Sequence, residues 1–126
     1  MDKLNPITAA IVHSALRIHM KLGPGLLEFV YEAVLAHDLM RQGFHVQRQK
    51  PISFEFEGHW FQDACRVDLV IDHAVVVEVK SRPTISLVHE KQLLTYLRLM
   101  DLRVGLLLNF GAALMKDGIR RVVHRF

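Results

Sequence analysis

Residues 74–80, Ala-Val-Val-Val-Glu-Val-Lys, constrain the fold more than any other part of the chain. Residues 74–77 are four apolar residues in a row, and three of them are the β-branched residue valine. A strand that is apolar on successive positions is covered on both faces, so it lies in the middle of a sheet. The chain must therefore bring helices against both sides of a sheet.

The segments around this strand supply those helices and the remaining strands. Apolar stripes at helical spacing predict helices over residues 6–22, 26–42 and 86–100, with Asn5 and Ser86 as expected N-caps. Alternating or valine- and leucine-rich segments predict strands over about residues 44–57, 60–71, 74–80, 103–110 and 119–125. Pro51 indicates an edge strand or a bulge. The order predicts an α/β fold with a mixed central β-sheet flanked by helices.

Length and composition narrow the class of protein. A chain of 126 residues with 51% hydrophobic and 23% charged residues is one globular domain, residues 1–126. No apolar run could span a bilayer, and residues 1–8 lack a secretory signal pattern. With one cysteine, Cys65, no internal disulfide can form. We therefore expect a soluble, cytoplasmic protein. Its net charge of +3 is compatible with a polyanionic partner without requiring one.

Three polar residues interrupt the apolar strands. Asp68 lies within Val-Asp-Leu-Val-Ile, and Glu78 and Lys80 lie on one face of the central strand because side chains alternate. A charge in such a strand costs several kcal/mol unless it is paired or bound to metal. Two carboxylates can hold Mg²⁺ or Mn²⁺, whose bound water is acidified, and an ammonium can steady developing negative charge. A buried carboxylate–lysine salt bridge explains the same pattern.

The register of the hairpin decides between these explanations. A two-residue turn at Asp72 and His73 would place Asp68 opposite Val77, so Asp68 and Glu78 would point to opposite faces. A shared metal site requires a shift of one, through a three-residue loop at residues 72–74 or a bulge near Asp68. We predict that this shift is present and that the site opens toward Glu28.

Two helices present further polar residues. Glu28 and Tyr31 are i,i+3 neighbours at the start of the second helix, where a carboxylate also benefits from the helix dipole. His89, Gln92 and Tyr96 form a polar stripe on the third helix, which directly follows Lys80. Each set has a structural explanation as well, as a favourable charge or as a half-buried polar face.

Five motifs in order resemble the GxxExxY protein family. They are G-L-L-E-F-V-Y from Gly25, R-V-D-L-V-I from Arg66, V-V-E-V-K from Val76, V-H-E-K-Q-L-L-T-Y-L from Val88 and G-L-L-L-N-F-G from Gly105. The resemblance runs from about Ile7 to Val123. That family is placed in the PD-(D/E)xK nuclease superfamily, which implies a restriction-endonuclease-like core. No proline precedes Asp68, and the loop at residues 81–83 differs from the relatives.

The resemblance implies a function and a site. It implies a Mg²⁺- or Mn²⁺-dependent nuclease acting on DNA or RNA, with Asp68, Glu78 and Lys80 as its catalytic core. Glu28 matches an acidic residue of the first core helix, which would hold a second metal ion or its water. Gln92 and Tyr96 match a Q-x-x-x-Y element that positions the phosphate or Lys80. The predicted substrate contacts are Arg82, Lys91, Arg98, Tyr31 and His89.

Other functions stay open at this point. A catalytically silent module that binds nucleic acid or protein would keep the same fold. An interaction subunit with a purely structural salt-bridge network is a third interpretation. A homodimer or an unidentified protein partner is compatible with all three.

Overall fold

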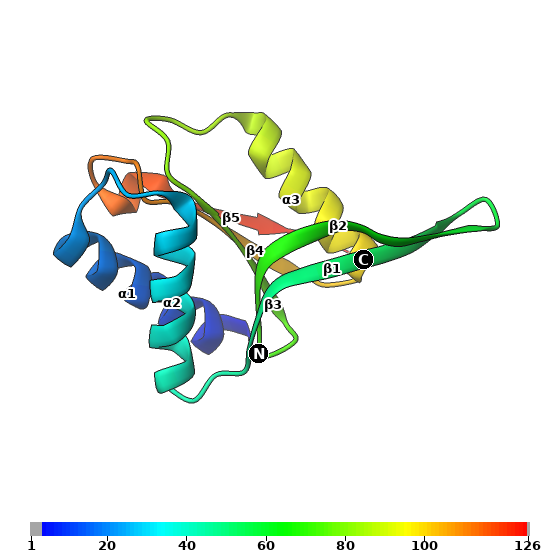
Figure 1. The fold of residues 1–126 in the computed structure, drawn as a ribbon, viewed down its shortest axis with the longest axis horizontal. Coiled ribbons are helices and arrows are strands. Elements are labelled where there is room, and N and C mark those ends of the chain that lie inside the picture. The colour runs from blue at the N-terminus through cyan, green and yellow to red at the C-terminus, as the bar shows by residue number, and fades with distance from the viewer. Residues whose placement is uncertain (1–3, 126) are drawn as a thin grey trace.

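The computed structural model describes residues 4–125, so residues 1–3 and 126, at the two ends of the predicted domain, lie outside the described part of the chain. The longer helices and the strands follow one another in the order that the sequence predicts (Figure 1). The helices are α1 (Leu4–Leu22), α2 (Glu28–Arg41), α3 (Leu87–Met100) and the short 3₁₀ helix η1 (Met115–Gly118). The strands are β1 (Val46–Phe56), β2 (His59–Ile71), β3 (Val75–Lys80), β4 (Val104–Asn109) and β5 (Ile119–Val123).

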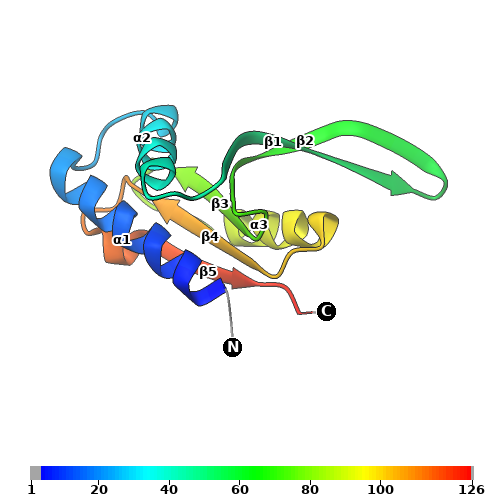
Figure 2. The ribbon, with the colours of Figure 1, turned by 90° about the horizontal axis from the view of Figure 1, so that it is seen from below.

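The five strands form one mixed sheet in the order β1-β2-β3-β4-β5. β1, β2 and β3 are successive antiparallel neighbours, β3 and β4 run parallel, and β5 returns antiparallel to β4. The parallel pair exists because α3 carries the chain from the end of β3 back to the start of β4 (Figure 2). β3 is the central strand, as its valine run predicts.

Helices cover both faces of the sheet. On one face, α1 and α2 pack against alternate residues of β3 and β4, among them Val77 and Leu106. On the other, Leu93 and Leu97 of α3 pack against Val76 and Leu107. The predicted α/β fold with a mixed, helix-flanked sheet is thus confirmed. None of the helices in the described residues has the length and apolar character needed to cross a membrane.

Two predicted helix caps have different outcomes. Ser86 is the N-cap of α3, where its backbone N–H donates to the His89 ring at 3.3 Å. α1 begins at Leu4, so Asn5 lies inside the helix and is not its cap. The carbonyl of Asn5 accepts a hydrogen bond from the Thr8 hydroxyl instead, at 3.1 Å. The prediction for Asn5 is therefore wrong, because the helix already includes Leu4, the residue before the Asn-Pro pair.

The β1–β2 hairpin extends far beyond the body of the protein (Figures 1 and 2). Its pairing register shifts between Ile52 and Phe54, and Asp63 on β2 has a positive φ of 48° there. Ile52 is the last residue of β1 that is buried in the core under α3. We call residues 53–64, beyond this bulge, the hairpin arm. Pro51 lies just before the bulge on the edge strand, as expected for a residue without an N–H.

Candidate active site

The turn between β2 and β3 sets the register of the site. Ile71 pairs with Val75, which leaves a three-residue loop of Asp72, His73 and Ala74. Asp72 and His73 have φ of 52° and 56°, values that Asp and His tolerate better than most residues. The loop is fixed from outside, since the Asp72 carboxylate accepts the His45 N–H at 2.8 Å. The predicted shift of one residue is therefore present in the structure.

Asp68 and Glu78 face each other where the β2–β3 ladder ends. The last ladder pair before them is Leu69 with Val77. Beyond this pair, backbone N–H groups of the two strands donate to the side-chain carboxylates of Asp68 and Glu78. The Asp68 N–H donates to Glu78 Oε2 and the Val79 N–H donates to Asp68 Oδ2, both at 2.7 Å. Every second residue of β3, namely Val76, Glu78 and Lys80, points to the face of the sheet that α3 covers.

Both carboxyl groups are held in a poorly solvated place. Glu78 is only 6% exposed. Burial and then repulsion from Asp68 raise the pKa of Glu78 to about 7. Burial raises the pKa of Asp68 as well, with a further contribution from Glu32, while Lys80 and the Val79 N–H oppose the rise. Two carboxylates that resist ionisation side by side are a favourable place for a cation.

The raised pKa of Glu78 predicts a pH-dependent stability. Glu78 ionises near pH 4.5 in the unfolded chain and near 7 in the folded one. The unfolded state therefore loses its proton first, and stability falls as pH rises through this interval, by about 3 kcal/mol in total. Glu78→Gln removes this loss. Urea unfolding in a chelator should show the variant gaining on the wild type between pH 5 and pH 8. Parallel pH profiles for the two proteins would contradict the burial argument.

Glu32 is a buried acid on α2, four residues after Glu28. It is 5% exposed, and it is paired with Arg48, whose Nε donates at 3.2 Å. Gln49 Nε2 donates to Glu32 at 2.9 Å and reaches Asp68 Oδ1 at 3.4 Å. Gln49 has a φ of 50°, in the left-handed region that non-glycine residues seldom occupy. Gln49 thus bridges Glu32 of α2 to Asp68 of β2.

Glu28 stands at the first position of α2, on the rim of the same cleft. Its side chain is 45% exposed, and Arg82 Nε lies 3.8 Å from its Oε1. The cleft has a volume of about 510 Å³ and is lined by Leu26, Leu27, Glu28, Phe29, Glu32, Gln49, Asp68 and Ser81. Asp68 therefore opens into the same cleft as Glu28, whereas Glu78 and Lys80 are not among the residues that line it.

The α3 stripe reaches the site from the other side. Tyr96 is half-buried, and its pKa is raised by burial and by the charge of Glu78, while a hydrogen bond with Gln92 opposes this. The pKa of His89 is lowered by burial and by the nearby cations Lys80 and Arg82. The Tyr96 hydroxyl and the His89 ring therefore both lie within electrostatic range of the predicted catalytic residues.

A buried asparagine holds the loop that follows Lys80. Asn109 is 2% exposed at the end of β4. Its Oδ1 accepts the N–H groups of Arg82 and Gly111 at 3.0 and 3.1 Å, and its Nδ2 donates to the Arg82 carbonyl at 3.0 Å. Two of these bonds fix the backbone of Arg82 beside the strand end that carries Lys80, and the third holds Gly111 to the same side chain.

Three predicted substrate contacts lie elsewhere. Tyr31 is fully buried and stacks on Phe110 at a ring distance of 4.5 Å. Its hydroxyl donates to the Gly23 carbonyl and accepts the Leu26 N–H at 3.1 Å. Tyr31 is therefore a structural residue that orders the loop before α2. Its side chain is not available for the predicted contact with substrate.

Lys91 and Arg98 are also displaced from the site. Both are exposed, and at 100° per residue they lie on the side of α3 opposite to the buried Leu93. They face away from the sheet and from Glu78. Of the three predicted lysine and arginine contacts with substrate, Arg82 alone, among residues 4–125, pairs with an acidic residue of the cleft, Glu28.

The donor set fits a hard divalent cation. Asp68, Glu78 and the Val79 carbonyl would hold it, because Mg²⁺ needs only one or two carboxylates and keeps several waters. Asp68 and Glu78 each use one carboxylate oxygen to accept a backbone N–H from the neighbouring strand, so one oxygen of each remains for a cation. Within residues 4–125, no group of three or more His, Cys, Asp or Glu side chains is arranged as a metal cluster. The site thus offers two facing carboxylates and not a complete cage.

The fold and this arrangement define a class of protein. A mixed sheet with helices on both faces, and an acid–acid–lysine set on its two central antiparallel strands, has the architecture of restriction-endonuclease-like proteins. The profile of the PD-(D/E)XK nuclease superfamily matches residues 5–122. The chain belongs to that superfamily. A search of curated proteins and a search of solved structures returned no match.

Proposed function

We propose that this protein is a divalent-metal-dependent nuclease that hydrolyses phosphodiester bonds in DNA or RNA. The observation that carries the proposal is the register at the end of β2 and β3. That register places Asp68 directly opposite Glu78, with Lys80 two residues further on the same face. Membership in the PD-(D/E)XK superfamily supports the same reaction class.

Each residue has a defined part in the proposed reaction. Asp68 and Glu78 would hold Mg²⁺ or Mn²⁺, which when bound supplies an acidified water and stabilises charge on the phosphate. Lys80 stands at the strand end, where its ammonium can orient the attacking water or stabilise negative charge on the phosphate. Its charge already opposes the rise in the pKa of both carboxyl groups.

The helices complete the site. Gln92 holds Tyr96 through a hydrogen bond, so the Tyr96 hydroxyl can position a phosphate oxygen or Lys80. Arg82 and His89 would contact the substrate backbone. Glu28 would bind a second metal ion or its water, and we add Glu32 as a carboxylate that Arg48 and Gln49 hold toward Asp68.

The finer assignments are proposals of the same kind. We propose that the chain is a GxxExxY-type member of the superfamily and that it works in the cytoplasm on nucleic acid. The motifs from Gly25 to Gly111 support this placement within the superfamily.

The second candidate is a module that binds nucleic acid or protein without cleaving it. The reciprocal hydrogen bonds of Asp68 and Glu78 favour it, because they give both carboxylates a structural use. Metal titration separates the two functions. A nuclease should bind Mn²⁺ with an affinity that Asp68→Asn lowers, whereas a silent module should show no Mn²⁺ binding that depends on either carboxylate.

The most direct test is a panel of single-stranded and double-stranded DNA and RNA, each incubated with Mg²⁺ or Mn²⁺. Wild-type protein should cleave at least one substrate, and Glu78→Ala and a chelator should each abolish that cleavage. Cleavage that persists in folded Glu78→Ala would assign the activity to a contaminant or to another site. Absence of cleavage on every substrate, together with no metal binding, would support the silent module.

A further inference from the structure

The hairpin arm, residues 53–64, exposes aromatic side chains to solvent. Phe56 and Trp60 are 61% and 62% exposed and Phe61 is 46% exposed. Not one residue of the arm is buried. Phe54 and Phe61 pair across the two strands with ring centroids 5.6 Å apart, and Phe56 shares their face. A two-stranded ribbon is marginal by itself in water, and an aromatic surface of this kind marks an interaction site.

The charge of the arm restricts its partner. Residues 53–64 contain Glu55, Glu57 and Asp63 and no lysine or arginine, in a chain whose net charge is +3. A nucleic acid backbone would be repelled by these carboxylates. The surface that fits the arm must therefore be apolar and basic.

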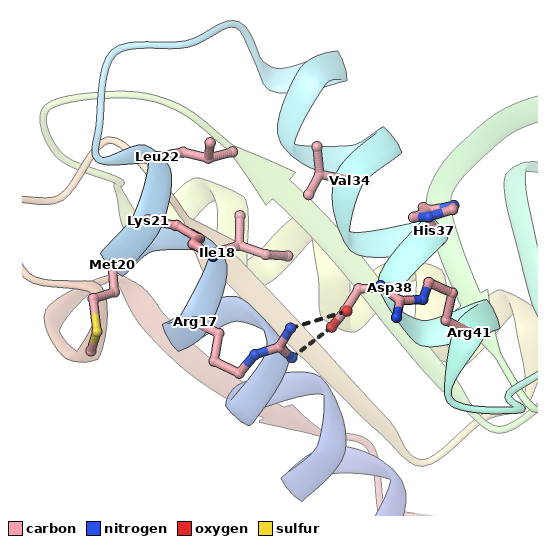
Figure 3. A pocket seen from close by; sticks show the side chains of 9 residues that line it. All are labelled: Arg17, Ile18, Met20, Lys21, Leu22, Val34, His37, Asp38 and Arg41. Carbon is pink, nitrogen blue, oxygen red and sulfur yellow. Dashed lines mark hydrogen bonds and ion pairs between the residues drawn. The ribbon is translucent and has the colours of Figure 1, made fainter.

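A groove on the same protein has that character. It lies between α1 and α2, has a volume of about 600 Å³ and is drawn in Figure 3. Ile18, Leu22 and Val34 give it an apolar lining. Lys21 and Arg41 stand at its sides, and among residues 4–125 neither makes an ion pair within 4 Å.

A third cation of the groove is already neutralised. Arg17 forms a two-pronged pair with Asp38, at 2.9 and 3.2 Å. This pair and the Ser14 hydroxyl lower the pKa of Asp38 to about 2. Asp38 therefore does not cancel the charges of Lys21 and Arg41, which stay available to an acidic partner.

The arm cannot reach this groove in its own molecule. The arm and the helices α1 and α2, whose residues line the groove, lie at opposite ends of the long axis in both ribbon views (Figures 1 and 2). Two copies placed side by side in opposite directions would bring each arm toward the groove of the other. This arrangement is a closed two-fold contact, the commonest symmetry of protein dimers.

We propose that the protein forms a reciprocal dimer in which the aromatic, acidic arm of each copy occupies the basic α1–α2 groove of its partner. The inference does not depend on the proposed nuclease activity. It predicts that Trp60, the single tryptophan of the chain, becomes shielded on association.

Dilution of the full chain tests the proposal. Sedimentation should show a dimer at high protein concentration and a monomer at low concentration. Trp60 emission should move to longer wavelength over the same concentrations, because the indole returns to water. A wild-type protein that stays monomeric throughout would overturn the proposal, and so would a mass that grows without limit, since that indicates a one-way, open contact.

Charge reversal identifies the two surfaces. Glu55→Lys/Glu57→Lys on the arm, or Lys21→Glu/Arg41→Glu in the groove, should each weaken self-association about tenfold or more. A mixture of the two variants should regain a dimer, because the reversed arm then meets the reversed groove and the two unreversed surfaces also match. Lys91→Glu/Arg98→Glu on the outer face of α3 is the matched control and should dimerise like the wild type.

The remaining outcomes overturn the proposal. A dimer that neither reversal weakens uses another surface. Reversed variants that fail to rescue each other, with unchanged circular dichroism, show that arm and groove do not meet. Trp60 emission that responds to an added oligonucleotide and not to protein concentration assigns the arm to nucleic acid.

Discussion

Asp68→Asn, Glu78→Ala and Lys80→Ala are each expected to lower phosphodiester cleavage by about a hundredfold or more. Asp68 and Glu78 would hold the metal ion together and Lys80 would act on the attacking water or the phosphate, so the proposed reaction needs all three. Cleavage of a labelled oligonucleotide under single-turnover conditions measures the loss. Circular dichroism and thermal melting establish that each variant is folded.

The double variant makes the test sharper. Residues that act as one unit lose activity non-additively, so Asp68→Asn/Glu78→Ala should be scarcely worse than either single variant. Asp117→Asn and Lys116→Ala are matched controls, because both residues are exposed on η1. Full activity in a folded Lys80→Ala protein would remove the role proposed for Lys80. Multiplying losses in the double variant would show that the carboxylates act independently.

Gly111→Ala is expected to destabilise the protein by about 3 kcal/mol or more, which lowers the melting temperature by about 10 °C. A Cβ at this position would lie 2.2 Å from the Arg82 carbonyl oxygen and 2.4 Å from its nitrogen. Asn109 holds these backbone atoms of Arg82 by hydrogen bonds, so they cannot move aside without breaking those bonds. Thermal melting measures the effect.

Gly58→Ala is the control for the glycine substitution. A Cβ at Gly58 meets nothing within 4 Å, so the change carries only the strain of its φ of 85°, about 1–2 kcal/mol. Gly111→Ala should also reduce cleavage, because it displaces the loop that carries Arg82 next to Lys80. Equal melting temperatures for the two variants would mean that the Arg82 loop is free to move.

Local sequence signals predicted most of the fold because they rest on short-range physics. The valine run of β3 shows that both of its faces are covered, and period-two spacing shows that Glu78 and Lys80 share one face. The hairpin register followed from counting residues and from the requirement that two acids converge. The cap prediction for Asn5 is wrong because an asparagine before a proline is common at helix starts but does not fix the residue at which a helix begins.

The site was harder to predict where it depends on distant segments. Glu32 gave no signal beyond its i+4 spacing from Glu28. Its importance comes from Arg48 and Gln49, which only the packing of β1 beside α2 brings to it. Tyr31 shares the helix start with Glu28 but turns inward onto Phe110, a contact across 79 positions of sequence that periodicity cannot foresee. Lys91 and Arg98 were predicted from nearness in sequence, whereas the direction of each side chain around α3 decides what it can reach.

The three-residue turn at residues 72–74 has a consequence for how proteins of this kind can diverge. Deleting one residue there would put Asp68 opposite Val77, with its carboxylate on the opposite face of the sheet from that of Glu78. Replacing all three residues while keeping their number leaves the pairing of Leu69 with Val77 intact. The other end of β2 tolerates changes in length. The bulge between Ile52 and Phe54 lies between the hairpin arm and Asp68, so a longer or shorter arm leaves the strand pairing near Asp68 unchanged. Descendants of one ancestor could therefore lengthen or shorten their arms freely, while insertions and deletions at the turn would be eliminated along with the site.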